Sequence, residues 1–135
     1  MGLDMYLKRA RFIGDEWIAS SSSELVYWRK ANMIRQWIVD HTDYPQNGDC
    51  LYHELSREQI EALLSDCKKV YEAQDDKLSA EILPTSSGYY FGSTKYDEYY
   101  YEDIKYTIEK LEELLEDWDE ITEDDIWKVC YYEWW

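Results

Sequence analysis

Apolar and polar residues alternate near both ends of the chain, with the two-residue period of a half-buried β-strand. Near the N-terminus this pattern predicts a strand over residues 3–9, and a second short extended piece is expected at 16–18. The same alternation predicts a strand at 50–55 and a terminal strand within 126–135. These segments together are enough for a small sheet.

Three other segments repeat apolar residues every three or four positions, which is the spacing of an amphipathic helix. They predict helices over 24–41, 56–73 and about 95–117. The second has the clearest start, because Ser56 and Gln59 have the spacing of a capping box. Each helix presents one apolar stripe that needs a partner surface.

The remaining segments are expected to be irregular. The polar run 74–81 ends the second helix, and 119–125 is predicted to be an acidic turn. For the triplet Tyr89–Phe91, the pattern leaves a short strand and a loop equally open. Residues 1–135 are therefore expected to form a single α+β domain, with a small, mainly antiparallel sheet packed against three helices.

Negative charge is concentrated in one part of the sequence. The chain has 30 acidic and 14 basic residues, a net charge of −16, and residues 97–125 alone contain fourteen acids and two lysines. On the predicted helix most of these acids lie opposite the apolar stripe, where like charges repel one another. We expect them to bind a partner, in a surface made of Glu98, Glu102, Glu109, Glu113, Glu116, Glu120, Asp124 and Asp125, with Tyr99 at its rim.

This charge restricts the classes of partner. Binding to nucleic acid or to anionic lipid needs lysine and arginine, so a basic protein is the expected partner, with no direct contact to nucleic acid or membrane. The spacing of the glutamates is compatible with mimicry of nucleic-acid phosphates, although a simple solvated helix face remains an open alternative. Three cysteines without clustered spacing and the absence of a long apolar segment favour a reducing, cytoplasmic location.

Residues for catalysis or metal binding do not form a recognisable set. Cys50 and His53 have a zinc-like spacing beside Asp49, but on a strand they would point to opposite faces. His41 is the only other histidine, and no nucleophile or phosphate-binding motif occurs. We therefore expect no enzyme, cofactor or metal site, with a site under the aromatic segment 84–101 as the enzymatic alternative.

Four motifs carry a resemblance to a known group of proteins. "MGLDMYL", "YWRKAN", "LPTSSGYYFGST" and "YDEYYYED" resemble a family of small acidic proteins encoded by phages and prophages. The similarity covers residues 1–8, 26–40, about 51–70 and 82–104, while the segment before "LPT" is shorter here. The family has no established catalytic residues to transfer, and the resemblance implies a phage origin.

The charge and the resemblance lead to the same functional expectation. Small acidic phage proteins include inhibitors of host defence, such as anti-CRISPR proteins that occupy basic nucleic-acid channels. We therefore expect a non-enzymatic inhibitor that blocks the basic cleft of a CRISPR effector or another nucleic-acid-binding host protein. The alternative is a homo-oligomeric structural or adaptor protein, for instance a homodimer joined edge to edge through the terminal strand "VCYYEWW".

Overall fold

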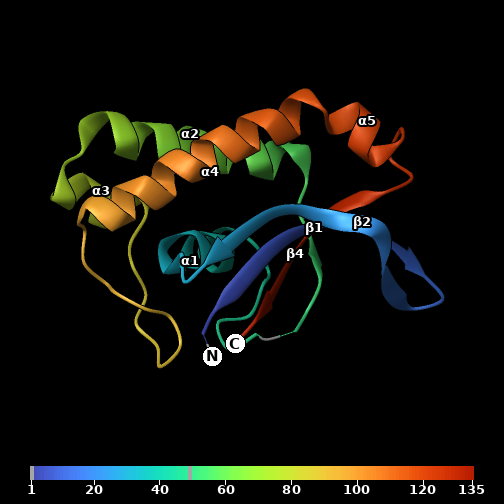
Figure 1. Ribbon diagram of the computed structural model, residues 1–135, viewed down its shortest axis with the longest axis horizontal. Coiled ribbons are helices and arrows are strands. Elements are labelled where there is room, and N and C mark those ends of the chain that lie inside the picture. Colours follow the sequence, from blue (N-terminus) through green and yellow to red (C-terminus); the bar gives the residue numbers. More distant parts are fainter. Residues whose placement is uncertain (1, 49) are drawn as a thin grey trace.

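The computed structural model describes residues 2–48 and 50–135 and shows one antiparallel sheet with helices packed against it (Figure 1). This confirms the expected α+β class. The helices α2 and α4 pack against each other on one side of the strands. In chain order the elements are β1 (Asp4–Ile13), β2 (Glu16–Arg29), α1 (Asn32–His41), β3 (His53–Glu54), α2 (Arg57–Ala73), α3 (Asp76–Ile82), α4 (Glu98–Glu116), α5 (Trp118–Thr122) and β4 (Lys128–Trp134).

The sheet has the strand order β2-β1-β4-β3, and all its pairs are antiparallel. β1 and β2 form a hairpin whose turn residues Gly14 and Asp15 have φ values of 56° and 68°. Two consecutive positive φ values match the twist of a two-residue hairpin, and glycine adopts them without a steric penalty. The C-terminal strand β4 then pairs along β1, so both chain ends contribute to the centre of the sheet.

The terminal strand β4 lies inside the sheet. The edge-to-edge homodimer considered above required β4 to be a free edge strand, and it is not. On its outer side β4 pairs with β3, and two further hydrogen bonds extend this contact. The amide of Cys50 donates to the carbonyl of Glu133, and the amide of Leu55 donates to the carbonyl of Val129. Because this side of β4 is already paired, edge-to-edge addition of a second copy there would require opening the sheet.

The predicted alternation of β1 separates the two faces of the sheet. Leu3, Met5 and Leu7 are buried in the core, whereas Tyr6 and Lys8 are only partly covered. The core side also receives Val26 and Trp28 from β2 and Val129 and Tyr131 from β4. The helices pack on this side, and the opposite face carries the partly exposed side chains of Tyr6, Lys8 and Tyr132, while Cys130 beside them is buried.

The clearest helix prediction is confirmed in detail. At the start of α2 the Gln59 amide donates to Ser56 Oγ at 3.1 Å, and the Ser56 amide donates to Gln59 Oε1 at 2.9 Å. This reciprocal pair satisfies two amide groups that have no partner within the helix. The helix α4 is also confirmed, but it begins after Asp97, whose side chain accepts from the amide of Tyr100.

The helix predicted over 24–41 is wrong in its first part. Residues up to Arg29 continue β2, and α1 begins only at Asn32. The alternation of Val26, Tyr27 and Trp28 suits a strand as well as the helical spacing does, and pairing with β1 decides between them. The serine-rich run 20–23 also lies within β2.

Smaller corrections concern the irregular segments. The strand expected at 50–55 shortens to two residues, because only 53–54 pair with β4. The run 74–81 is not irregular, since Asp75 caps the short helix α3. The triplet 89–91 forms a turn, and the amide of Phe91 donates to the carbonyl of Gly88. The first part of the predicted acidic turn belongs to the short helix α5, and the three residues 123–125 that follow have positive φ values.

Candidate protein-binding surfaces

The helix α4 separates apolar and acidic residues onto opposite faces, as its sequence predicts. Tyr100, Ile104 and Leu111 are fully buried, together with Thr107, which accepts a 2.8 Å hydrogen bond from Trp28 Nε1. The side turned away from the core carries the acids. We call this surface the acidic ridge and define it as Glu98, Glu102, Glu109, Glu113 and Glu116 on α4, followed by Glu120, Asp124 and Asp125.

Every residue expected to bind a partner is exposed in the structure, including Tyr99 at 68%. The ridge is nevertheless not one straight helix. α4 ends at Glu116 after 19 residues, or about 28 Å, and α5 starts as a separate short helix at Trp118. Glu120 therefore lies on a second helix, and Asp124 and Asp125 lie in the connection that follows it.

Few of these acids have a basic neighbour. Lys110 Nζ lies 3.7 Å from Glu113 Oε2, and Lys128 Nζ lies 2.7 Å from Asp125 Oδ1. Exposed ion pairs of this kind contribute little to stability and neutralise only part of the local charge. Within the described part of the chain, no ion pair involves the other ridge residues, which are Glu98, Glu102, Glu109, Glu116, Glu120 and Asp124.

One carboxyl group beside the ridge differs from the exposed ones. Asp103 is partly buried on α4, and this burial, together with repulsion from Glu102, raises its pKa to about 6. It lines a small hollow of about 160 Å³ that also contains Lys95 and Asp97. Its charge therefore changes within the range between mildly acidic and neutral pH, unlike that of an ordinary aspartate.

Most of the rings between residues 87 and 103 serve packing. Phe91 and Tyr100 are buried, and the Tyr100 hydroxyl donates to the carbonyl of Leu83 at 2.7 Å. The amide of Thr85 donates to the Tyr96 hydroxyl at 3.1 Å. Two rings remain at the surface, those of Tyr89 and Tyr99, so only part of this aromatic segment can contribute to binding.

Two of the cysteines are buried, and His41 packs against an aromatic ring. Cys67 and Cys130 are buried, which raises the pKa of the Cys67 thiol and raises that of the Cys130 thiol to about 12. A nucleophilic cysteine needs the opposite shift. His41 stacks on the ring of Trp37, and its Nδ1 lies 2.8 Å from the Trp37 carbonyl.

Among the described residues, the structure brings no third metal ligand to Cys50 and His53. Cys50 is exposed and His53 packs edge-on against the ring of Tyr44. Asp49, the third residue of that spacing, lies outside the described residues. Within the part of the chain that the structure does describe, no three cysteine, histidine or acidic side chains form a group that could hold a metal ion.

A buried ion pair lies between α1 and β4, and it was not foreseen from the sequence. Arg35 Nε donates to both carboxylate oxygens of Glu133, at 2.8 and 3.0 Å, and both side chains are fully buried. Arg35 Nη2 donates to the carbonyl of Gln46, while the Tyr131 hydroxyl donates to Glu133. Nothing in a single sequence links two residues so far apart.

A second surface, on the open side of the sheet, was also missed. Tyr6 and Tyr132 face each other on the two central strands, with ring centroids 6.2 Å apart. The period-two patterns of β1 and β4 separate Tyr6 and Tyr132 from the core-facing residues, but they do not show that these two strands are neighbours. We call this surface the open face and define it as Asp4, Tyr6, Lys8, Glu24, Tyr27, Arg29, Tyr52, Tyr132 and Trp134.

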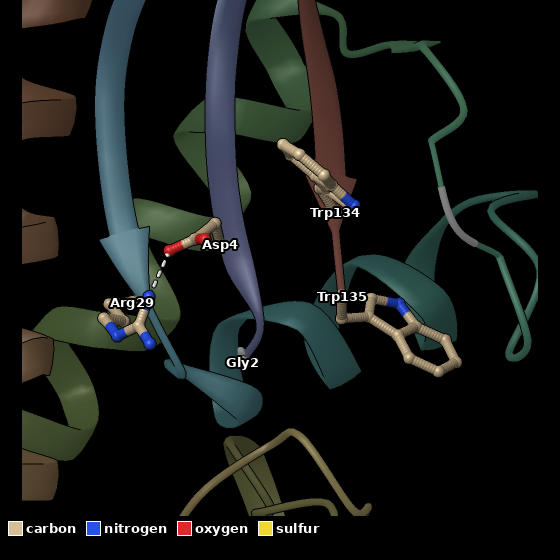
Figure 2. A pocket seen from close by; sticks show the side chains of 5 residues that line it. All are labelled: Gly2, Asp4, Arg29, Trp134 and Trp135. Carbon is tan, nitrogen blue, oxygen red and sulfur yellow. Dashed lines mark hydrogen bonds and ion pairs between the residues drawn. The ribbon is translucent and has the colours of Figure 1, made fainter.

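One end of the open face is hollowed. A pocket of about 340 Å³ lies between Arg29 and Asp4 on one side and Trp134 and Trp135 on the other, with Gly2 at its base. Figure 2 shows these side chains around the hollow, with Arg29 joined to Asp4. The pocket is therefore a continuation of the open face, since Asp4, Arg29 and Trp134 belong to both.

Among the described residues, no helix is both long enough and apolar enough to cross a membrane. Comparison of the whole chain with family models, with curated proteins and with solved structures gives no match.

Proposed function

We propose that this protein is a phage-encoded, non-enzymatic inhibitor of a host defence protein. In this proposal the acidic ridge occupies a basic cleft that normally binds nucleic acid, as in a CRISPR effector. The observation that carries the proposal is the exposure of six ridge carboxylates for which the described residues provide no ion pair. A helix selected for stability alone would alternate its charges.

The geometry of the ridge suits a groove that accommodates a nucleic-acid backbone. A row of carboxylates on α4 extends for about 28 Å, and the break at Asp117 turns the row where α5 begins. Lysine and arginine side chains that bind phosphates can bind carboxylates instead, with similar hydrogen bonds. Attraction between opposite charges would accelerate association, and salt would weaken it.

The experiment is a competition assay with purified proteins. A guide-RNA-loaded CRISPR effector is incubated with labelled target DNA, and displacement of the DNA by this protein is measured at low and high salt. The test variant carries Glu102→Lys, Glu109→Lys and Glu113→Lys. We expect it to lose inhibition, because three attractive contacts become repulsive.

The matched control reverses three exposed acids on the neighbouring helix α2, Glu58, Glu61 and Glu72, to lysine. It makes the same change in net charge and should keep inhibiting if the ridge is the binding surface. Undiminished inhibition by the ridge variant would refute the proposal. Failure of the unmodified protein to inhibit any effector in a representative panel would refute its anti-CRISPR form.

A further inference from the structure

The open face has the composition of a protein interface. Tyrosine, tryptophan and arginine are enriched at interfaces, and here Tyr6, Tyr27 and Tyr132 are partly exposed while Trp134 is 62% exposed. The open side of an antiparallel sheet more often carries small or charged polar side chains, because it faces water. The rings on this face are therefore not explained by the fold alone.

The open face is also electrically balanced, although the molecule as a whole is not. Its acids are Asp4 and Glu24, and its bases are Lys8 and Arg29. The chain has a net charge of −16, and the acidic ridge lies on the outward side of α4. Two copies of such a chain repel each other in most orientations, and least when their open faces meet.

The charged groups on this face are held in place by neighbours. Asp4 accepts from the Tyr27 hydroxyl at 2.6 Å and from Arg29 Nη1 at 2.8 Å. Lys8 Nζ lies over the rings of Tyr6 and Tyr132, at 4.9 and 4.5 Å from their centroids. Because these groups are already ordered, a contact that buries them loses less side-chain entropy than it would with mobile lysines and arginines.

The charges on the open face are arranged so that two copies of this face would place opposite charges against each other. Along β1, Asp4 and Lys8 lie two residues on either side of Tyr6 and have opposite signs. Along β2, Arg29 lies opposite Asp4 and Glu24 lies opposite Lys8, again with opposite signs. A two-fold axis across the strands at the level of Tyr6 therefore places Asp4 over Lys8 of a second copy and Arg29 over its Glu24.

We propose that the open face binds a second copy of this chain, sheet against sheet, in a two-fold symmetric dimer. This contact is isologous, so it closes at two copies and does not extend into a filament. It places the helices of both copies on the outside, with the two acidic ridges on opposite sides of the dimer. The dimer is independent of the proposed inhibitor function, which requires only the ridge.

The size of the face sets the expected strength. Four strands about 4.8 Å apart and the seven residues of β4 give a footprint of about 450 Å² per copy. The total of about 900 Å² is at the transient end of specific interfaces. We therefore expect a reversible dimer with a dissociation constant in the micromolar range.

Salt separates this dimer from partner binding by the ridge. Long-range repulsion between two chains of the same charge opposes dimerisation, and salt screens it. The dimer should accordingly become tighter at high salt, whereas a complex between the ridge and a basic protein should become weaker. The two proposals therefore predict opposite responses to the same variable and can fail separately.

The experiment is analytical ultracentrifugation of the full chain, from low micromolar to near-millimolar concentration, at low and high NaCl. We expect the unmodified protein to pass from monomer to dimer and to do so at lower concentration in high salt. Tyr132→Glu should abolish the dimer, because it places two carboxylates in the centre of the contact. The matched control Tyr99→Glu, on α4, should retain it.

A second variant protects the test against misfolding of the first. Glu24→Lys changes an exposed side chain, so the chain should still fold, with only a small loss of thermal stability from repulsion by Lys8 on β1. Repulsion from Arg29 of the second copy should raise the dissociation constant. A wild-type chain that stays monomeric at both salt concentrations would overturn the proposal, as would a dimer that survives both variants.

Two further outcomes would assign the face differently and would equally overturn the proposal. One is a monomeric chain that binds a fluorescent oligothymidylate and loses this binding with Tyr132→Glu, which would identify a platform for single-stranded nucleic acid. The other is a dimer that is lost with Phe12→Ser but not with Tyr132→Glu. Phe12 is 58% exposed and lies in the part of the β1–β2 hairpin that does not pair with β4. That result would therefore place the contact on the hairpin.

Discussion

The buried pair of Arg35 and Glu133 gives the sharpest test of how this fold is stabilised. Replacing Glu133 with glutamine preserves the shape of the side chain but removes its negative charge. The guanidinium of Arg35, which is fully buried and donates to both carboxylate oxygens, would then have no opposing charge.

The cost follows from the physics of buried charges. Removing one partner of a buried ion pair typically destabilises a protein by about 3–5 kcal/mol, because the remaining charge is not compensated. Domains of this size have a total stability of about 5–15 kcal/mol. Arg35 keeps its hydrogen bond to the carbonyl of Gln46 in the variant, so we expect a loss near the lower end, about 3 kcal/mol.

The assay is urea unfolding followed by tryptophan fluorescence, with Glu133→Gln, Arg35→Met and the double variant forming a cycle. The double variant should recover part of the loss, since it leaves no buried charge. Recovery should be incomplete, because Arg35→Met removes the donor that satisfies the carbonyl of Gln46. A cost below about 1 kcal/mol for Glu133→Gln would be too small for a buried charge and would refute this reasoning.

Three further predictions concern single groups. Ser56→Ala removes the acceptor of the capping box and should lower the free energy of unfolding by about 1 kcal/mol in urea titrations; an unchanged midpoint would contradict this. The pKa of Asp103 is raised in the folded state from 3.8 to about 6, so the folded chain binds its proton more tightly and stability should fall as pH rises between these values. Asp103→Asn should flatten that slope in unfolding curves measured across this pH range, and an unaltered slope would exclude Asp103 as its source. Of the three thiols, exposed Cys50 should react with a thiol reagent in the native protein, whereas Cys67 and Cys130 should react only on unfolding; rapid native labelling of three thiols would contradict the burial.

The two surfaces of this molecule differ in what holds them in place. Most of the acidic ridge follows from one helix, because the packing of the apolar stripe of α4 fixes the direction of five of the eight ridge acids. The open face requires three strands brought together from both ends of the chain, because Tyr6, Tyr27 and Tyr132 come from β1, β2 and β4. A local substitution can remove charge from the ridge, but the open face exists only in the assembled sheet.

Local information was sufficient wherever neighbours in sequence decide the structure. The capping box and apolar stripe of α2, the alternation of β1 and the exposed side of α4 all follow from side-chain spacing, because helices and strands repeat every 3.6 and 2 residues. These patterns predicted the fold class and the exposure of every expected ridge residue. They also placed the end of this helix at about 117, next to Glu116, but they did not predict the short helix α5 that follows it.

Only the tertiary structure decided the rest. Residues 24–29 satisfy a helical and a strand pattern equally, and pairing with β1 selects the strand. Three features depend on segments that are far apart in the chain. They are the pairing of β4 with β1 and β3, the ion pair between Arg35 and Glu133, and the cluster of rings on the open face. Their positions depend on which strands become neighbours, and the free energy of that choice comes from burial and hydrogen bonding across the whole domain, which no local pattern contains.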